Sequence, residues 1–252
     1  MPRVDAVIIG GGTISDPELR EAAGVDSKSL IMLKGKPMIE WVASALKASD
    51  SIGSIAAVGP PSLADSDLAG IVDHVLPERE HEVDNLLAGM DAMPDADRIL
   101  MVSGDTPLLT PEAVNDLLRN APVADIVYPS VEKAAIMAQF GDRKWVFVRT
   151  REGEMTGSST VLFRPAAFRD HEDTLRKVFD ARRSVAALVQ MWGITFAVKF
   201  ALGQLSLRDV EERISEVLNV EGRSYVSSYP ELAFDVDKPS DITLAEQRLS
   251  SR

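Results

Sequence analysis

The sequence has no cysteine and only three histidines, and both shortages narrow the chemistry open to its 252 residues. Without cysteine there can be no disulfide bond, no thiolate nucleophile and no cysteine-based zinc site. The histidines are His74, His81 and His171, and their spacing matches no metal-binding pattern. The lack of cysteine fits a reducing compartment, so we expect a cytoplasmic protein.

Basic residues are scarce relative to acidic ones. The chain has 27 Lys and Arg against 39 Asp and Glu, which gives a formal net charge of −12. Such a chain is poorly suited to DNA or RNA, because nucleic-acid binding requires many cations against the phosphates. We therefore expect no nucleic-acid partner. A small phosphorylated ligand, held by a few local cations and a metal ion, remains compatible with this charge.

Long hydrophobic runs are also lacking. The segment most similar to a membrane helix is residues 185–205. It contains Gln190, Lys199 and Gln204. A spanning helix needs about 20 apolar residues with few or no charges. We therefore expect a buried amphipathic segment here and no stable membrane insertion.

What the first 130 residues do contain is an alternation of apolar runs and amphipathic segments. The predicted strands are 4–9, 52–58, 74–76, 99–102 and 125–128. The predicted helices are 36–48, 84–93 and 112–119. Strands that are apolar on both faces are typical of a mostly parallel sheet covered by helices. The pattern predicts an α/β fold with three layers, α/β/α, around a mostly parallel, mixed sheet.

The pattern changes after residue 130. Strands are predicted at 145–150, 160–163 and 233–236, and helices at 181–203, at 207–218 and from 240 onward. No linker, repeat or low-complexity segment interrupts the chain. We therefore expect one domain over residues 1–252.

Polar groups that follow the strands are the first candidates for a site, since open α/β sheets bind ligands beyond the carboxyl ends of their strands. The first strand runs into Gly10, Gly11 and Gly12, whose backbone N–H groups can approach phosphate oxygens. Lys28 follows and can place a charge on those phosphates. The alternative to a phosphate-binding loop is a flexible connection between a strand and a helix. A dinucleotide-binding loop fits poorly, because Ser15 stands at the third glycine position, and a Walker A loop is excluded by its spacing.

Acidic side chains follow two other apolar segments. Asp105 comes after strand 99–102, where it can bind Mg²⁺ or simply close a turn. Asp235 and Asp237 come at the end of segment 233–236. They alternate by two, so both side chains point to one face if the strand continues. The sequence predicts a divalent-metal site here, with a surface turn and helix cap as the alternative.

The order and spacing of several motifs are those of one family. The chain carries the glycine loop, "LKGKPMIEWV", "DNLLAGMDAM", "SGDTPLL" and "FDVDKPSDITLAE" in that order. It resembles the MobA-like nucleotidyltransferases, which have a Rossmann-like nucleotide-diphospho-sugar transferase (GT-A-like) fold and include molybdenum cofactor guanylyltransferases and cytidylyltransferases. The resemblance covers most of the first 130 residues and the last 25. It implies transfer of a nucleotidyl group from an NTP to a small phosphorylated acceptor, with release of pyrophosphate and dependence on Mg²⁺ or Mn²⁺.

The resemblance also implies roles for individual residues. Residues 1–130 would form the nucleotide-binding half and residues 131–252 the acceptor-binding half. The implied nucleotide-binding residues are Gly10, Gly11, Gly12, Lys28 and Asn85. The implied catalytic residues are Lys28 and Asp105. The implied metal ligands are Asp105 and Asp237, with Asp235 as the alternative second ligand. Thr156 and Gly157 follow a turn and can contact an acceptor, although a plain hairpin explains them equally well. The oligomeric state is left open.

One departure from the family pattern bears on activity. The family loop usually carries an arginine shortly before the lysine, and this loop lacks it; Arg20, later in a longer loop, is the nearest cation. Two alternatives therefore stand beside a transferase. One is an inactive nucleotide-binding protein on the same fold, and the other is a glycosyltransferase that uses an NDP-sugar.

Overall fold

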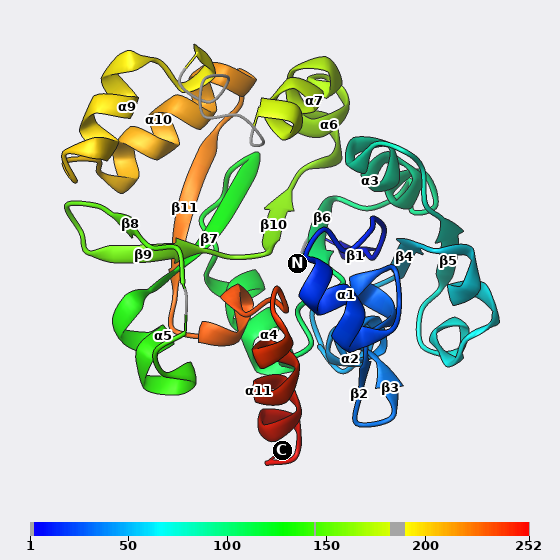
Figure 1. The fold of residues 1–252 in the computed structure, drawn as a ribbon. Coiled ribbons are helices and arrows are strands. Elements are labelled where there is room, and N and C mark those ends of the chain that lie inside the picture. Colours follow the sequence, from blue (N-terminus) through cyan, green and yellow to red (C-terminus); the bar gives the residue numbers. More distant parts are fainter. Residues whose placement is uncertain (1–2, 144, 182–189, 252) are drawn as a thin grey trace.

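The computed structural model of the protein describes residues 3–143, 145–181 and 190–251. The described strands form one nine-stranded sheet and one small ribbon (Figure 1). The strands of the large sheet are β1 (Val4–Ile9), β4 (Ile55–Gly59), β5 (His74–Pro77), β6 (Arg98–Ser103), β7 (Ile126–Glu132), β8 (Val148–Arg149), β9 (Glu154–Gly157), β10 (Thr160–Phe163) and β11 (Gly222–Ser227). The ribbon pairs β2 (Met32–Leu33) with β3 (Lys36–Pro37).

The helices surround this sheet and cover both of its faces. They are α1 (Pro17–Ala23), α2 (Met38–Lys47), α3 (Glu82–Asp91), α4 (Pro111–Asn120), α5 (Lys133–Phe140), α6 (Pro165–Arg169), α7 (Glu172–Ala181), α9 (Ile194–Ala201), α10 (Leu207–Leu218) and α11 (Pro239–Leu249). In the described residues, no helix combines the length and the hydrophobicity needed to cross a membrane. Of the segment 185–205 weighed above, residues 185–189 lie outside the described residues.

The sheet is mixed and mostly parallel. Its strand order is β5-β4-β1-β6-β10-β7-β9-β8, and β11 pairs with β7 in addition to this order. Strands β5, β4, β1 and β6 are parallel, whereas β10 lies antiparallel between β6 and β7. The carboxyl ends of β1, β4 and β6 therefore meet at one edge, which is where polar loops were expected.

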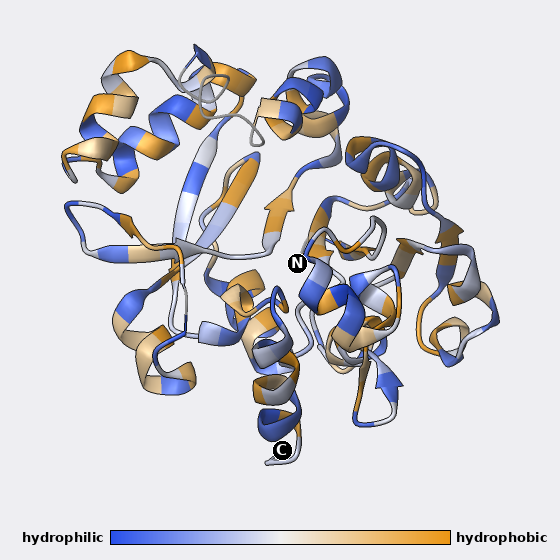
Figure 2. Cartoon of the chain, viewed as in Figure 1, coloured by the Kyte–Doolittle hydropathy of each residue, from blue (hydrophilic) through white to orange (hydrophobic). Residues whose placement is uncertain are grey.

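Alternation along the strands explains the three layers. Ala6 and Ile8 of β1 pack toward α2 and α4, while Val7 packs toward α3. Because successive strand residues point to opposite faces, a strand covered on both sides is apolar throughout. Figure 2 shows this character along β10 and in part of β7, and a more hydrophilic β11. The predicted three-layer α/β/α fold is confirmed.

Several predictions for the second half of the chain are wrong in detail. Residues 233–236 form no strand; a 3₁₀ turn over Pro230–Ala233 leads into an extended segment in which Phe234 and Val236 are buried as core side chains. The predicted strand 145–150 is only two residues long, because Trp145 packs its ring on Phe140 and Phe234. The predicted helix 181–203 instead comprises the end of α7 and α9, with residues 182–189 outside the described part.

The close contact between α3 and β1 gives a stability prediction. A Cβ atom on Gly89 would lie 2.5 Å from Cγ1 of Val7, which is fully buried. Alanine gains about 1 kcal/mol over glycine within a helix, but overpacking a core costs about 1–3 kcal/mol. We expect Gly89→Ala to lower the free energy of unfolding by about 1 kcal/mol in urea titrations. Adding Val7→Ala should make the Gly89→Ala change favourable, and a single variant more stable than the parent would contradict this.

Candidate active site

Three polar cavities adjoin one another at the carboxyl edge of the sheet. The first, the α3 cavity, has a volume of about 570 Å³ and includes Gly11, Gly12, Arg79 and Asn85. The second, the glycine-loop cavity of about 420 Å³, is lined by Gly10–Gly12, Lys28, Ser103 and Asp105. The third, the Ser158 cavity of about 400 Å³, is lined by Asp105, Tyr128, Ser158, Ser159 and Asp235. Neighbouring cavities share wall residues, so together they form a trough past Asp105.

Lys28 joins two carboxylates from distant parts of the chain. Its Nζ donates to Oδ2 of Asp105 at 3.0 Å and to Oδ1 of Asp237. Burial disfavours the charged ammonium, but the charges of Asp105 and Asp237 outweigh this and raise the pKa of Lys28. The structure therefore brings together three of the residues singled out in the sequence, with one cation between two acids.

Close backbone packing sets the position of Asp105. The N–H of Gly104 donates to the carbonyl of Ile9 at 2.8 Å, and a Cβ on Gly104 would lie 3.0 Å from Cα of Gly10. A glycine is needed at position 104 because two chain segments approach so closely. Ser103 donates its hydroxyl to Oδ1 of Asp105, and the N–H of Val236 donates to the Asp105 carbonyl at 3.1 Å. These contacts tie the end of β6 to the other two segments of the site.

Asp235 and Asp237 engage different partners. Asp237 contacts Lys28, whereas Oδ1 of Asp235 accepts from Arg143 Nη2 at 3.0 Å. Burial, with the nearby charges of Asp237 and Asp105, raises the pKa of Asp235 to about 6. The expectation that both side chains share one strand face is wrong, because no strand forms here. Asp235 still lines the Ser158 cavity together with Asp105.

The donor set suits a divalent cation that keeps water and substrate oxygens as ligands. Within the described residues, no three His, Cys, Asp or Glu side chains are grouped as a metal cluster. Two carboxylates nevertheless converge on one cation, the Lys28 ammonium. Mg²⁺ is commonly bound through one or two carboxylates plus substrate phosphates, so Asp105 and Asp237 fit this mode of binding.

The glycine loop presents backbone donors to the α3 cavity. Gly12 has φ +94°, and its N–H donates to Oε2 of Glu78 at 2.6 Å. A carboxylate oxygen thus occupies a donor of the kind that binds phosphate oxygens. Asn85 is buried in the first turn of α3, where Oδ1 accepts from the backbone N–H of Arg79 at 2.6 Å. Asn85 and the loop therefore line the same cavity.

Arg20, the cation considered in the sequence as a substitute for the loop arginine, lies away from the cavities beside this loop. Arg20 lies on α1 and pairs with Asp26 at 3.0 Å, and it is absent from the described walls of the three cavities. Arg79 instead lines the α3 cavity beside Gly11 and Gly12. No local motif marks Arg79, because only the fold brings the chain after β5 next to the glycine loop.

The predicted acceptor-contact residues lie close to the third cavity. Thr156 and Gly157 end β9, and the next two residues, Ser158 and Ser159, line the Ser158 cavity. A Cβ on Gly157 would lie 1.9 Å from the hydroxyl oxygen of Tyr128, so only glycine leaves that hydroxyl its place. Tyr128 was not singled out in the sequence, since its position depends on pairing between β7 and β9.

Comparisons with known proteins agree with this geometry. The sequence model of the MobA-like NTP transferase domain matches residues 20–191. A solved structure of a hypothetical transferase from Thermus thermophilus is 35% identical, with a TM-score of 0.84, and the alignment covers 96% of this chain and all of that one.

Curated relatives match over shorter stretches. A 3-deoxy-manno-octulosonate cytidylyltransferase from Acaryochloris marina is 33% identical over 100 residues, which is 36% of this chain and 39% of the relative. A bifunctional protein GlmU from Oenococcus oeni is 29% identical over 120 residues, 47% of this chain and 26% of the relative. The matches therefore span between about a quarter and two fifths of the curated relatives' length.

Proposed function

Because the chain belongs to the MobA-like NTP transferase family, we propose that it moves a nucleotidyl group from an NTP to a phosphorylated acceptor and releases pyrophosphate. The observation that carries this proposal is the Lys28 ammonium between Asp105 and Asp237, beside a glycine loop with free space around it. A cation, paired carboxylates and backbone donors are the groups that phosphoryl chemistry requires.

We assign the donor nucleotide to the α3 and glycine-loop cavities. The Gly12 N–H would exchange Glu78 for a phosphate oxygen, and Arg79 would add charge where the family loop arginine is missing. Asn85 would orient the nucleoside from the first turn of α3. Lys28 would turn from the carboxylates toward the phosphates, a change open to a long side chain that is about 29% exposed.

Asp105 and Asp237 would hold Mg²⁺ or Mn²⁺. When bound, such an ion neutralises phosphate charge and favours departure of pyrophosphate. Ser103, by donating to Asp105, holds that carboxylate in orientation. We retain Asp235 as a carboxylate positioned by Arg143 rather than as the second ligand.

In the reaction, an oxygen of the acceptor phosphate attacks the α-phosphorus in line. A bond forms between that oxygen and the α-phosphorus, while the bond between the α-phosphorus and the bridging oxygen of pyrophosphate breaks. Lys28 offsets the charge that builds on the leaving group. No serine, cysteine or histidine nucleophile is needed, because positioning and electrostatic stabilisation supply the catalysis.

The test is NTP binding by calorimetry and pyrophosphate release across the four ribonucleotides, with and without Mg²⁺. We expect one NTP to bind more tightly with Mg²⁺, and Asp105→Asn to remove most of that enhancement, about tenfold. Asp50→Asn, at an exposed position outside the trough, is the matched control and should behave as the parent. If no NTP binds to the parent, the proposal fails. Binding without pyrophosphate release under any acceptor, or sugar transfer from an NDP-sugar, would favour one of the two alternatives.

A further inference from the structure

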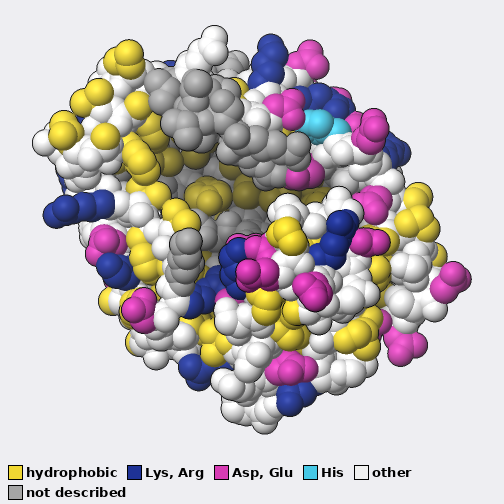
Figure 3. All heavy atoms as spheres, viewed as in Figure 1, with side chains coloured by type: hydrophobic (Ala, Val, Ile, Leu, Met, Phe, Trp, Pro, Cys, Tyr) yellow, Lys and Arg dark blue, Asp and Glu magenta, His cyan; other side chains and the backbone are white. Residues whose placement is uncertain are grey.

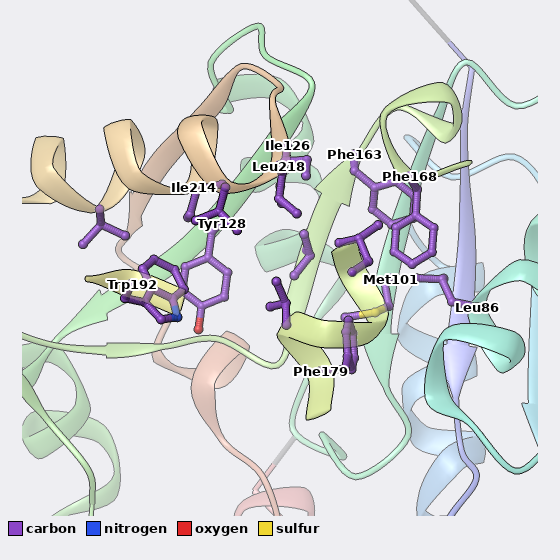
Figure 4. Close-up of a pocket in the computed structure, with 15 residues that line it drawn as sticks. Leu86, Met101, Ile126, Tyr128, Phe163, Phe168, Phe179, Trp192, Ile214 and Leu218 are labelled. Carbon is purple, nitrogen blue, oxygen red and sulfur yellow. The ribbon is translucent and has the colours of Figure 1, made fainter. Parts of the chain in front are cut away.

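A fourth cavity, the apolar pocket, lies between the sheet and the helices α3, α6, α7 and α10 (Figure 4). Its volume is about 450 Å³. Among the described residues of its wall, the only side-chain heteroatoms are the Tyr128 hydroxyl, the Trp192 indole nitrogen and the Met101 sulfur. All remaining described wall side chains are hydrocarbon. Figure 3 shows hydrophobic side chains in the hollow of this face.

The size of the apolar pocket sets it apart from a packing defect. Protein interiors are close-packed, and voids larger than a water molecule are few. Ligand pockets have volumes of about 300–1,000 Å³ and mostly apolar walls with a few polar groups. The apolar pocket matches both criteria, so we treat it as a binding pocket.

The apolar pocket is continuous with the candidate active site. Four of its wall residues also line the Ser158 cavity that contains Asp105: Met101, Tyr128, Val161 and Phe179. The apolar pocket also meets the α3 cavity at Phe179. Since the nucleotide is assigned to the α3 and glycine-loop cavities, the apolar pocket is left for the other substrate, whose polar end reaches Asp105 through the Ser158 cavity.

Tyr128 marks the boundary between the polar and apolar parts. Its hydroxyl lies at the pocket wall toward Trp192 in Figure 4, and the absence of a side chain at Gly157 leaves that hydroxyl its place. Burial raises the pKa of the phenol, so the group stays neutral and able to donate a hydrogen bond. A molecule with a polar head and a hydrocarbon tail would meet this hydroxyl at the junction of the two.

Apolar character continues beyond the apolar pocket. Trp192 contacts Phe196 of α9, with ring centroids 5.1 Å apart. Ile194 and Val198 of the same helix are 75% and 52% exposed. Through the Trp192–Phe196 contact, apolar surface continues from the pocket wall to α9, where a hydrocarbon can also bind. A fully hydrophilic acceptor gives no reason for these features.

From this geometry we infer that the acceptor is amphiphilic, a phosphomonoester whose hydrocarbon part occupies the apolar pocket while its phosphate lies beside Asp105. The inference rests on the proposed function. The acceptor phosphate oxygen forms the bond to the α-phosphorus, pyrophosphate leaves, and the product is a nucleoside diphosphate ester of the hydrocarbon alcohol. The apolar pocket itself takes no part in bond making; it selects and positions the acceptor.

The experiment is calorimetric titration of ethyl, butyl, hexyl and octyl phosphate, each below its critical micelle concentration, with Mg²⁺ present. Each buried methylene should tighten binding about fourfold, so burial of only two of the six methylenes that distinguish octyl from ethyl phosphate should tighten binding more than about tenfold. Val178→Phe, which places a ring into the apolar pocket from α7, should weaken octyl phosphate about tenfold and leave ethyl phosphate unchanged. Val123→Phe, at a site 80% exposed and away from the trough, is the matched control.

The outcomes separate this inference from the function on which it rests. Affinity that does not change with chain length overturns the amphiphilic acceptor, and so does a chain-length effect that Val178→Phe leaves intact. The series on the parent protein decides the question even if Val178→Phe does not fold. If NTP binding depends on Asp105 but alkyl phosphate affinity does not change with chain length, only the proposed acceptor class is overturned and the transferase function stands. Chain-length dependence in a protein that binds no NTP would overturn the transferase function and with it the acceptor role.

Discussion

Lys28→Met should lower the rate of pyrophosphate release by about 10²–10³-fold, the range found when one transition-state donor is removed. Lys28 is the cation at the centre of the trough, with its Nζ on Asp105 and Asp237. Methionine keeps the length and apolar stem of lysine, so the change removes the charge with little loss of packing. The rate is measured with the NTP that binds best and saturating Mg²⁺, and Lys47→Met, an exposed lysine in the last turn of α2, should change it little.

The same variant should bind metal more tightly when no nucleotide is present. In the parent, the ammonium of Lys28 occupies the position between the two carboxylates and competes with a divalent cation there. Without this ammonium, the neighbouring carboxylates of Asp105 and Asp237 repel each other, and a bound cation reduces that repulsion. We expect Mn²⁺, followed by its paramagnetic resonance signal, to bind Lys28→Met about tenfold more tightly than the parent. Weaker Mn²⁺ binding by the variant would show that the carboxylates do not share a metal with Lys28.

Local sequence patterns predict the buried parallel strands of the first half of the chain correctly, but not the edge strand or the extended segment of the second half. Strands β1 and β6 are apolar on both faces and bounded by glycine or polar turns, and both were predicted nearly to the residue. Strand β11 was missed, because it is an edge strand with polar residues along it. Segment 233–236 has the alternating pattern that predicts a strand, but the alternation reflects burial of Phe234 and Val236 in the core and not pairing in the sheet.

The site shows the same division. Lys28, Asp105 and Asp237 were found because each follows a recognisable motif, and the structure adds that they meet. Other charged residues that contact the site lie more than 50 residues away along the chain, and sheet pairing or helix packing brings them there. Arg143 reaches Asp235 and Asp241, and Glu78 reaches Gly12. No local pattern in a single sequence reports such long-range contacts, so they had to come from the structure.

Arg143→Met should have the largest effect on stability and lower the free energy of unfolding by about 3–5 kcal/mol. The guanidinium pairs with Asp235 at 3.0 Å and with Asp241 at 2.6 Å, and the Asp241 side chain is only 5% exposed. Removing the cation leaves a buried carboxylate without its counter-charge. Since domains are stable by about 5–15 kcal/mol, such a loss is a large part of the total. Urea unfolding measures it.

Arg208→Met is the matched control for this stability effect. Arg208 also forms an ion pair, with Glu212, but its side chain is 83% exposed. Surface pairs of this kind contribute about 0–1 kcal/mol. A loss in Arg143→Met no larger than in Arg208→Met would mean that solvent screens the Arg143 pairs as well.

The loss in Arg143→Met should also depend on pH. Burial and the charges of Asp237 and Asp105 raise the pKa of Asp235 from 3.8 to about 6, while Arg143 opposes that rise. A carboxyl group with a raised pKa favours the folded state below its unfolded pKa, and this contribution disappears as the pH rises through the folded pKa. Without Arg143 the pKa of Asp235 rises further, so the variant should recover part of its deficit as the pH falls from 7 to 5. A deficit that stays constant over this range would show that the charge on Asp235 contributes little. The loss would then come from the pair with Asp241 or from the contacts with Trp145 and Phe234, 3.9 Å and 4.8 Å from the ring centroids.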